Sequence, residues 1–129
     1  MREQEHHHAD LVKGIAEQLK PILTKSKQAI YVYLDDNHKV CNKKFADPLG
    51  YKSAKDWADM EAPLADVVEE DQPSVISAYE DASEKMVASY LDVRFKNVRT
   101  GKTVKTSMIV VPITDDGNHV FTVHFFSRK

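Results

Sequence analysis

Residues 42–71 restrict the possible folds of this chain more than any other stretch. They contain two short helix starts, a Gly50-Tyr51 turn and several large apolar side chains, and they lie between two regions rich in β-forming residues. Helices of fewer than about 12 residues are marginal in water unless they pack against another part of the protein. The short helices must therefore lie against a sheet that the flanking regions build.

Polar residues predict where these short helices begin. Asn42 follows a predicted strand, and its side-chain oxygen is placed to accept a hydrogen bond from an amide of the first helical turn that otherwise has no partner. Ser53, with Asp56 three residues later, has the same pattern. Trp57 is the large apolar side chain that this second helix is expected to bury.

A longer helix is predicted to start at Asp71 and to run to about Val87. Asp71 is expected to cap this helix, and Pro73 suits its first turn, where a missing amide costs nothing. Apolar side chains that recur at helical spacing are expected to face inward: Val75, Ile76, Tyr79, Ala82 and Met86.

Five segments have the composition of β-strands: residues 29–34, 39–41, 90–98, 103–113 and 119–127. Residues 35–38 supply a turn between the first two, and glycine-containing joints at residues 99–102 and 115–118 predict hairpins between the last three. The last two strands carry apolar residues on both faces, so the middle of the sheet must be covered from both sides. We expect residues 29–34 to form the central strand.

An amphipathic helix is predicted over residues 9–24. Its apolar residues recur at spacings of four, four and three and form one stripe: Leu11, Ile15, Leu19 and Ile22. Pro21 removes one backbone hydrogen bond, so the helix is expected to bend or restart near Lys20. The stripe needs an apolar partner, which is either the chain's own sheet or the same helix of a second molecule. We favour a homodimer, because Pro21 and the polar joint at residues 25–28 let the helix project from the domain.

The order of these elements resembles the PAS family of sensory domains over residues 28–128. In that family a strand-end Asn opens a short helix carrying a Phe, a Gly-Tyr turn follows, and a Glu-Asp pair starts the next long helix. The matching residues here are Asn42, Phe45, Gly50, Tyr51, Glu70 and Asp71. The resemblance implies an α+β fold: a PAS-like five-stranded antiparallel sheet with short helices on one face and an N-terminal amphipathic flanking helix. Residues 1–27 would form the tail and flanking helix, and residues 28–129 the PAS-like domain.

Charge and cysteine content exclude several classes of partner. The 18 basic and 20 acidic side chains give a formal net charge of −2, so no overall basic field favours nucleic acid or an anionic membrane surface. No apolar run reaches the roughly 18 residues that a membrane span needs, and the N-terminus lacks the apolar core of a secretion signal. A single cysteine excludes an internal disulfide. We expect a soluble, cytoplasmic chain.

The sequence offers little for catalysis, and we expect no enzyme and no catalytic residue. No glycine-flanked serine elbow and no glycine-rich phosphate loop is present. Cys41 stands close to two lysines, which would lower the pKa of its thiol if they face it. The alternative, which we favour, is that Cys41 is a small apolar filler where a strand meets a helix.

Histidine spacing predicts no metal site. The six histidines are His6, His7, His8, His38, His119 and His124, and outside the terminal run none has a ligand partner at helical or hairpin spacing. Haem-binding PAS members use a histidine on or after the long helix, a region without histidine here. Flavin-binding relatives carry an Asn-Cys-Arg motif where this chain has residues 60–64, Met-Glu-Ala-Pro-Leu. The cofactor is therefore unknown, with haem and cysteine-adduct flavin not supported.

A ligand pocket is the remaining site that the resemblance implies, between the inner face of the sheet and the helices. By position its candidate lining residues are Phe45, Trp57, Tyr79, Phe95 and Met108. The same residues would also fill a dry core, and both interpretations are open. Tyr79 is the most informative of them, because a buried phenol needs a hydrogen-bond partner and can offer one to a ligand.

The function that we expect is that of a stand-alone PAS-like sensory or signalling module. It would bind a small molecule, or relay the state of a partner protein in trans, through its N-terminal helix. An alternative is a ligand-free dimerisation or protein-interaction module, and a third is a small curved-sheet α+β enzyme. A core cavity with convergent polar groups would favour the sensory module over the interaction module.

Overall fold

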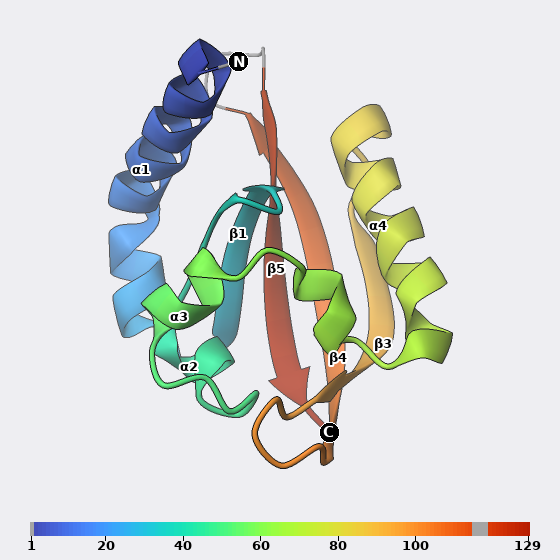
Figure 1. Ribbon diagram of the computed structural model, residues 1–129. Coiled ribbons are helices and arrows are strands. Elements are labelled where there is room, and N and C mark those ends of the chain that lie inside the picture. Colours follow the sequence, from blue (N-terminus) through green and yellow to red (C-terminus); the bar gives the residue numbers. More distant parts are fainter. Residues whose placement is uncertain (1, 115–118) are drawn as a thin grey trace.

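The computed structural model describes residues 2–114 and 119–129, and it confirms the predicted fold class (Figure 1). Five strands form one antiparallel sheet in the order β2-β1-β5-β4-β3. The strands are β1 (Ala29–Asp35), β2 (His38–Cys41), β3 (Ser89–Lys96), β4 (Thr103–Thr114) and β5 (Val120–Arg128). The helices are α1 (Arg2–Lys25), α2 (Lys43–Ala46), α3 (Ala54–Asp59), η1 (Pro63–Asp66), η2 (Glu69–Asp71) and α4 (Gln72–Lys85). The predicted turn at residues 115–118 lies outside the described residues.

The central strand is β5, so the expectation that residues 29–34 occupy the centre is wrong. β1 stands second, between β2 and β5, while β5 pairs with both β1 and β4. Four successive residues of β5, from Phe121 to His124, are buried, which requires cover on both faces. β1 also contributes side chains to both faces, but β2, its neighbour on one side, has only four residues. β5, which is longer than β1 and is buried on both faces, therefore takes the central place.

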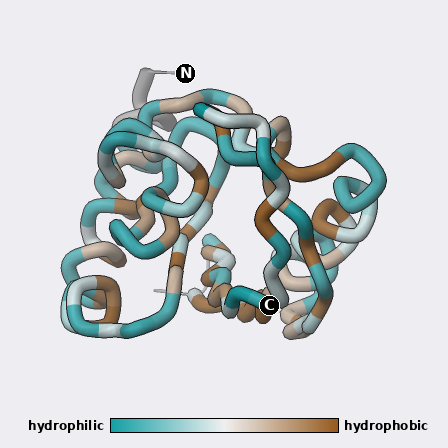
Figure 2. Tube along the Cα trace, turned by 90° about the horizontal axis from the view of Figure 1, so that it is seen from below, coloured by the Kyte–Doolittle hydropathy of each residue, from teal (hydrophilic) through white to brown (hydrophobic). Residues whose placement is uncertain are grey.

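One face of the sheet, here called the inner face, carries the larger hydrophobic cluster under α2, α3 and α4. Trp57 is 1% exposed, which confirms the burial predicted for it, and Phe45 at 2% lies against it. Successive residues of a strand point to opposite faces of the sheet. Figure 2 shows short hydrophobic and hydrophilic stretches alternating along the chain. The larger core thus lies between the inner face and the short helices, as the predicted packing requires.

The two predicted N-caps of the short helices are confirmed. The side-chain oxygen of Asn42 accepts hydrogen bonds from the amides of Phe45 and Ile30, each at 3.1 Å. Its amide group donates to the carbonyl of Gln28 at 2.9 Å, so one side chain caps α2 and fixes α2 to β1. Ser53 Oγ accepts from the amide of Asp56 at 3.1 Å and caps α3.

The Gly50-Tyr51 turn lies where the chain comes close to the β3–β4 connection. Gly50 has φ +89°, a backbone conformation that L side chains rarely adopt. A Cβ added there would also lie 2.5 Å from the side-chain oxygen of Asn97. Asn97 donates to the carbonyl of Pro48 at 3.0 Å, and this bond holds the turn against the loop. Glycine is therefore required at residue 50 for both backbone and packing reasons.

Asp71 does not cap α4, contrary to the prediction. Its carboxylate accepts hydrogen bonds from the backbone amide of Arg94 at 2.8 Å and from Arg94 Nε and Nη2 at 2.9 Å each. A planar guanidinium matches a carboxylate in two parallel bonds, which is stronger than one bond to a helix amide. Pro73 does lie in the first turn of α4, as predicted. Asp71 thus ties the start of α4 to β3.

The inward stripe of α4 differs from the predicted one. Val75, Ala78 and Ala82 are buried, whereas Ile76 is 42% and Met86 51% exposed. Ile76 is one residue, or about 100° of helix, from Val75, so it cannot share the buried face fully. Met86 lies beyond the end of the helix in a left-handed conformation, with φ 57°, and its amide bonds back to the carbonyl of Ala82.

The N-terminal helix α1 packs on the chain's own sheet, so the expected projection from the domain is wrong. Val12 and Ile15, each 6% exposed, pack in a second cluster with Ile30, Val32, Phe121 and Val123 on the outer face of the sheet. Leu11, Leu19 and Leu23 pack around this cluster, whereas Ile22 is 48% exposed. The apolar outer face and the apolar helix stripe cover each other, which is the fold-back alternative.

Pro21 neither ends nor restarts α1, which is continuous from Arg2 to Lys25. Pro21 is exposed, so water can reach the carbonyl that loses its amide partner. Within the described residues, no helix is long and apolar enough to cross a membrane. The division of the chain at residues 27 and 28 stays a prediction.

Two matched substitutions on α1 measure how it packs. Ile15→Ala should lower the free energy of unfolding by about 2–5 kcal/mol, as large-to-small changes in cores do. Ile22→Ala is the same substitution at an exposed position, and its free energy of unfolding should stay within about 0.5 kcal/mol of that of the parent. Urea denaturation of both variants gives the comparison. Small and equal losses at the two positions would contradict a helix packed on the sheet.

Candidate functional site: a cavity on the inner face

A cavity of about 230 Å³ lies between the inner face of the sheet and the helices. The floor comes from β1, β3 and β5, and the roof from α2, α3, η1 and α4. Its lining residues are Tyr31, Tyr33, Asp36, Phe45, Leu49, Trp57, Pro63, Leu64, Val67, Val75, Ile76, Tyr79, Phe95 and His124. The lining is mostly apolar with a few polar groups, which is the usual composition of a small-molecule site.

Aromatic rings form one wall of the cavity. The ring centroids of Tyr31 and Trp57 lie 4.9 Å apart, and those of Phe45 and Trp57 lie 5.1 Å apart at an interplanar angle of 82°. Phe95 continues the wall, with its ring 5.8 Å from that of Phe45. These edge-to-face and tilted contacts are favourable arrangements for aromatic pairs.

Hydroxyl and carboxylate groups gather at the other part of the lining. The Tyr33 hydroxyl donates a hydrogen bond to the Asp36 carboxylate, and the Tyr33 ring lies 5.3 Å from that of Tyr79. Burial raises the pKa of Tyr33, and the neighbouring Asp36 raises it further. Burial also raises the pKa of Tyr79. Both phenols therefore stay protonated at neutral pH. Because the Tyr33 proton is donated to Asp36, the Tyr33 oxygen can only accept a further hydrogen bond.

His124 is a buried polar residue under the cavity. It is 2% exposed, and its ring stacks on that of Tyr31 with centroids 4.0 Å apart. Its Nε2 lies 2.8 Å from the Thr122 hydroxyl and its Nδ1 3.3 Å from the Met108 sulfur. Burial lowers the pKa of His124 to about 3, so the imidazole is neutral. Because both ring nitrogens have partners, His124 is not placed to act as a general base.

The structure brings four of the five predicted pocket residues to one cavity. Phe45, Trp57, Tyr79 and Phe95 line it, and Met108 is buried but contacts His124 instead of the cavity. Sequence reasoning missed the polar lining residues Tyr31, Tyr33, Asp36 and His124. The period of two along β1 and β5 is the signal that would have placed Tyr31, Tyr33 and His124 on the inner face. That a ligand occupies the cavity stays a prediction.

Cys41 is buried and 9% exposed, in agreement with the apolar filler interpretation. Burial raises the pKa of its thiol to about 12, although the charge of Lys39 opposes this shift. The nearby Lys39 ammonium is itself held by three backbone carbonyls, at 2.6 Å from that of Asp36, 3.1 Å from that of Ala58, and also by that of Met60. The thiol therefore stays protonated and is a poor nucleophile.

The buried His124 predicts a defined loss of stability in acid. An unfolded chain binds a proton on this imidazole below its ordinary pKa of about 6.5, while the folded chain does not until about pH 3. Stability should therefore fall as the pH drops from about 6.5 toward 3, and His124 alone should account for about 2 kcal/mol between pH 7.5 and pH 5.

The comparison uses His124→Gln, a side chain that does not titrate and can still bond the Thr122 hydroxyl. Urea denaturation of both proteins at the two pH values gives four free energies of unfolding. The parent should lose about 2 kcal/mol more than the variant on acidification. Equal losses in the two proteins would show that the folded chain accepts the proton on His124.

No protein-family model and no curated protein sequence matches this chain. Solved structures do. A PAS domain from a two-component sensor histidine kinase matches with TM-score 0.64 and 16% identity, over 91% of this chain and 99% of that one. The PAS domain of an HTR-like protein from Haloarcula marismortui has TM-score 0.64 and 14% identity, with full coverage of both chains. The PAS domain of the fruit-fly ELK potassium channel has TM-score 0.66 and 16% identity, over 87% of this chain and 94% of that one. The chain therefore has the fold of a PAS domain.

Proposed function

We propose that this protein is a sensory or signalling module, not an enzyme, which binds a small molecule in the cavity on the inner face and passes its state to α1. The observation that supports this most is the cavity itself, a space of about 230 Å³ with aromatic walls and a cluster of phenol groups. PAS domains of similar fold occur in a two-component sensor histidine kinase and in a potassium channel.

The lining indicates the chemistry of the ligand. An engineered apolar cavity of about 150 Å³ binds benzene, so 230 Å³ accommodates a molecule of one or two small rings. The rings of Phe45 and Trp57 favour a flat apolar body. At one polar end the Tyr79 hydroxyl can donate a hydrogen bond, and the Tyr33 oxygen, whose proton goes to Asp36, can accept one. Asp36 already accepts from Tyr33 and would orient that hydroxyl.

The strand β1 is the physical link between the cavity and α1. Tyr31 and Tyr33 reach the cavity, while Ile30 and Val32 belong to the outer-face cluster that contains Ile15 of α1. Alternate residues of one strand therefore contact the ligand space and the helix. A ligand that shifts Tyr31 or Tyr33 changes the packing under α1, and we assign the output to a partner protein in trans that contacts this helix.

A cavity-filling variant tests the binding site. Leu64→Trp adds a large ring at a partly buried lining position and should abolish retention of a small molecule, as read by native mass spectrometry of protein purified from its natural source. Tyr33→Phe removes the hydroxyl oxygen that would accept from the indole N–H, and it should weaken binding of indole, used as a probe, by about 2- to 10-fold in a chemical-shift titration.

The matched control is Ile109→Trp, which adds the same ring to the outer face of the sheet, where Ile109 is 45% exposed. This variant should retain the same small molecule as the parent and should bind indole with the same affinity. A parent protein that retains no molecule and gives no chemical-shift change with indole would contradict the proposal and favour a dry core.

A second candidate function, a homodimeric interaction module, has its own supporting observation. Tyr90 and Ile109 are register partners on β3 and β4, they are 69% and 45% exposed, and they lie outside the part of the outer face that α1 packs against. Ile22 on α1 is a further exposed apolar side chain. Neighbouring exposed apolar residues of this kind mark protein contacts.

Sedimentation velocity tests the homodimer. The parent should sediment as a dimer at micromolar concentration, and Tyr90→Ser with Ile109→Ser should give a folded monomer, because the change removes apolar contact area without touching either core. Val98→Ser, at an exposed apolar site of the β3–β4 connection, is the control and should remain a dimer. Serine at Leu11, Ile15 and Leu19 is unsuited to this test, because those side chains pack within the monomer. A monomeric parent would contradict the dimer.

A further inference from the structure

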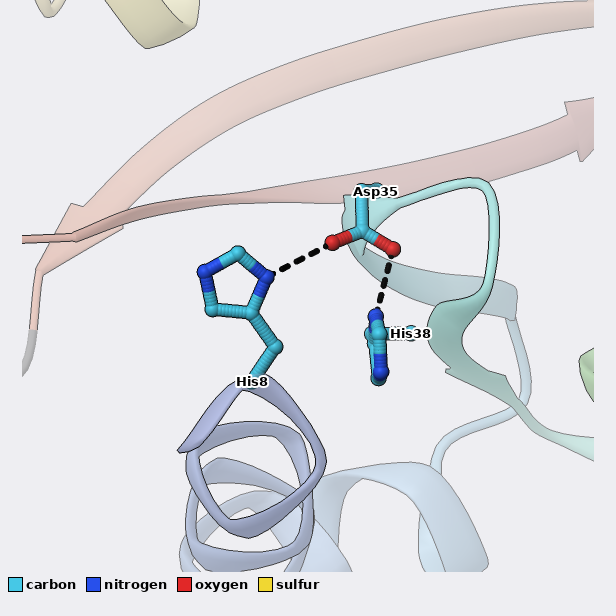
Figure 3. Close-up of side chains that lie close together, drawn as sticks. All are labelled: His8, Asp35 and His38. Atoms are coloured by element: carbon cyan, nitrogen blue, oxygen red, sulfur yellow. Dashed lines mark hydrogen bonds and ion pairs between the residues drawn. The ribbon is translucent and has the colours of Figure 1, made fainter. Parts of the chain in front are cut away.

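A group of three metal-ligating side chains lies where α1 meets the β1–β2 hairpin (Figure 3). The Asp35 carboxylate stands between two imidazole rings. His8 Nδ1 lies 3.0 Å from Asp35 Oδ2, and His38 Nδ1 lies 2.6 Å from Asp35 Oδ1. Ligand atoms of the three residues all lie within 4.8 Å of one another, and each residue is only partly buried. An ion from solvent can therefore reach them.

The position of His8 follows from the packing of α1. His8 is four residues before Val12, so both side chains lie on the same face of the helix, one turn apart. Val12 is buried against the outer face of the sheet, and this contact directs His8 toward the end of β1. Asp35 ends β1 and His38 begins β2, so the hairpin turn supplies the other two residues.

These distances suit a tetrahedral metal site after small rotations of the side chains. Zn²⁺ takes histidine nitrogen and carboxylate oxygen at about 2.0–2.2 Å, which places neighbouring ligand atoms about 3.3–3.6 Å apart. The present separations of 2.6 and 3.0 Å are hydrogen-bond distances. Insertion of an ion would replace these two hydrogen bonds and widen the gaps by less than about 1 Å.

A fourth nitrogen lies beside the group. Within the described residues, His119 Nδ1 is hidden from solvent and has no hydrogen-bond partner. The His119 ring is 5.4 Å from that of His8 and 5.0 Å from that of His7, both in edge-to-face contact. A buried ring nitrogen without a partner costs free energy unless something binds it. A metal ion coordinated by His8 would give His119 a partner at this position.

We propose that His8, Asp35 and His38 form a binding site for a divalent transition-metal ion of the Zn²⁺ class, with His119 as the fourth ligand. Imidazole ligands favour Zn²⁺, Cu²⁺ or Ni²⁺, whereas Mg²⁺ and Ca²⁺ require oxygen ligands. The proposal differs from the sequence-based expectation of no metal site, because His8 is 27 and 30 residues from its partners and no spacing rule relates them. This site does not depend on the cavity or its ligand.

The ion would tie the N-terminal part of α1 to the hairpin. Asp35, His38 and His119 lie on the sheet or its loops, and His8 lies on α1. A bound metal ion would therefore link α1 to the sheet, and removal of the metal would remove this link. Because α1 is also the proposed output element, occupancy of this site would set how firmly the helix is held.

Calorimetric titration of the full chain with ZnCl₂ tests the site, using protein purified without an affinity tag. The parent should bind one Zn²⁺ per chain, and MgCl₂ should give no binding. His38→Ala and Asp35→Asn should each weaken Zn²⁺ binding by at least about 10- to 100-fold, since even residues that only support metal ligands cost that much. His119→Ala should weaken binding to a smaller extent that is still measurable.

The His38→Ala variant also separates this site from adventitious binding by the terminal histidines, because it leaves residues 6–8 intact. Unchanged Zn²⁺ affinity in His38→Ala would place the ion on that run alone and would overturn the proposal. Asp47→Asn, an exposed change far from the group, is the matched control and should bind as the parent does. Circular dichroism confirms that each variant is folded.

Hydrogen exchange supplies a second readout. Zn²⁺ should slow amide exchange in residues 8–12 of α1 in the parent and leave it unchanged in His38→Ala. Zn²⁺ binding without any slowing in this segment would contradict the proposed link between α1 and the hairpin.

Discussion

The whole structure depends on one constraint: the middle of the sheet is apolar on both faces and must be covered twice. β5 pairs on both sides and buries four successive residues, so neither of its faces can meet water. The short helices and α4 cover the inner face, and α1 covers part of the outer face. Each cover is itself too short or too apolar to be stable alone, so the sheet and its covers stabilise one another.

The inner cover leaves an aromatic-lined cavity against the sheet. Large rings on β1, β3 and the short helices meet at angles and leave a cavity of about 230 Å³, while Val12 and Ile15 of α1 pack directly on the other side of the same strands. Polar groups at this cavity are held neutral: burial keeps His124 unprotonated and the phenols of Tyr33 and Tyr79 protonated. The lining thus offers hydrogen bonds without placing a net charge of its own beside an apolar ligand, apart from Asp36.

β1 is the element that connects the cavity, α1 and the proposed metal site. Its odd-numbered residues Tyr31 and Tyr33 face the cavity, its even-numbered residues Ile30 and Val32 face α1, and its last residue, Asp35, meets His8 of α1. Ligand binding and metal binding would therefore act on the same helix from two positions along one strand. Neither needs a change in the strand order of the sheet.

The sequence by itself determined the features that depend on near neighbours. Strand and helix periodicity, the N-caps at Asn42 and Ser53, and the tight turn at Gly50 each depend on a few consecutive residues, so their signals are local. Only the tertiary structure decided which strand is central, which surface α1 covers, and that Asp71 pairs with Arg94 instead of capping α4. The meeting of His8 with Asp35 was decided in the same way. These outcomes depend on contacts between residues far apart in the sequence, where packing and charge compete among many partners and no local pattern records the result.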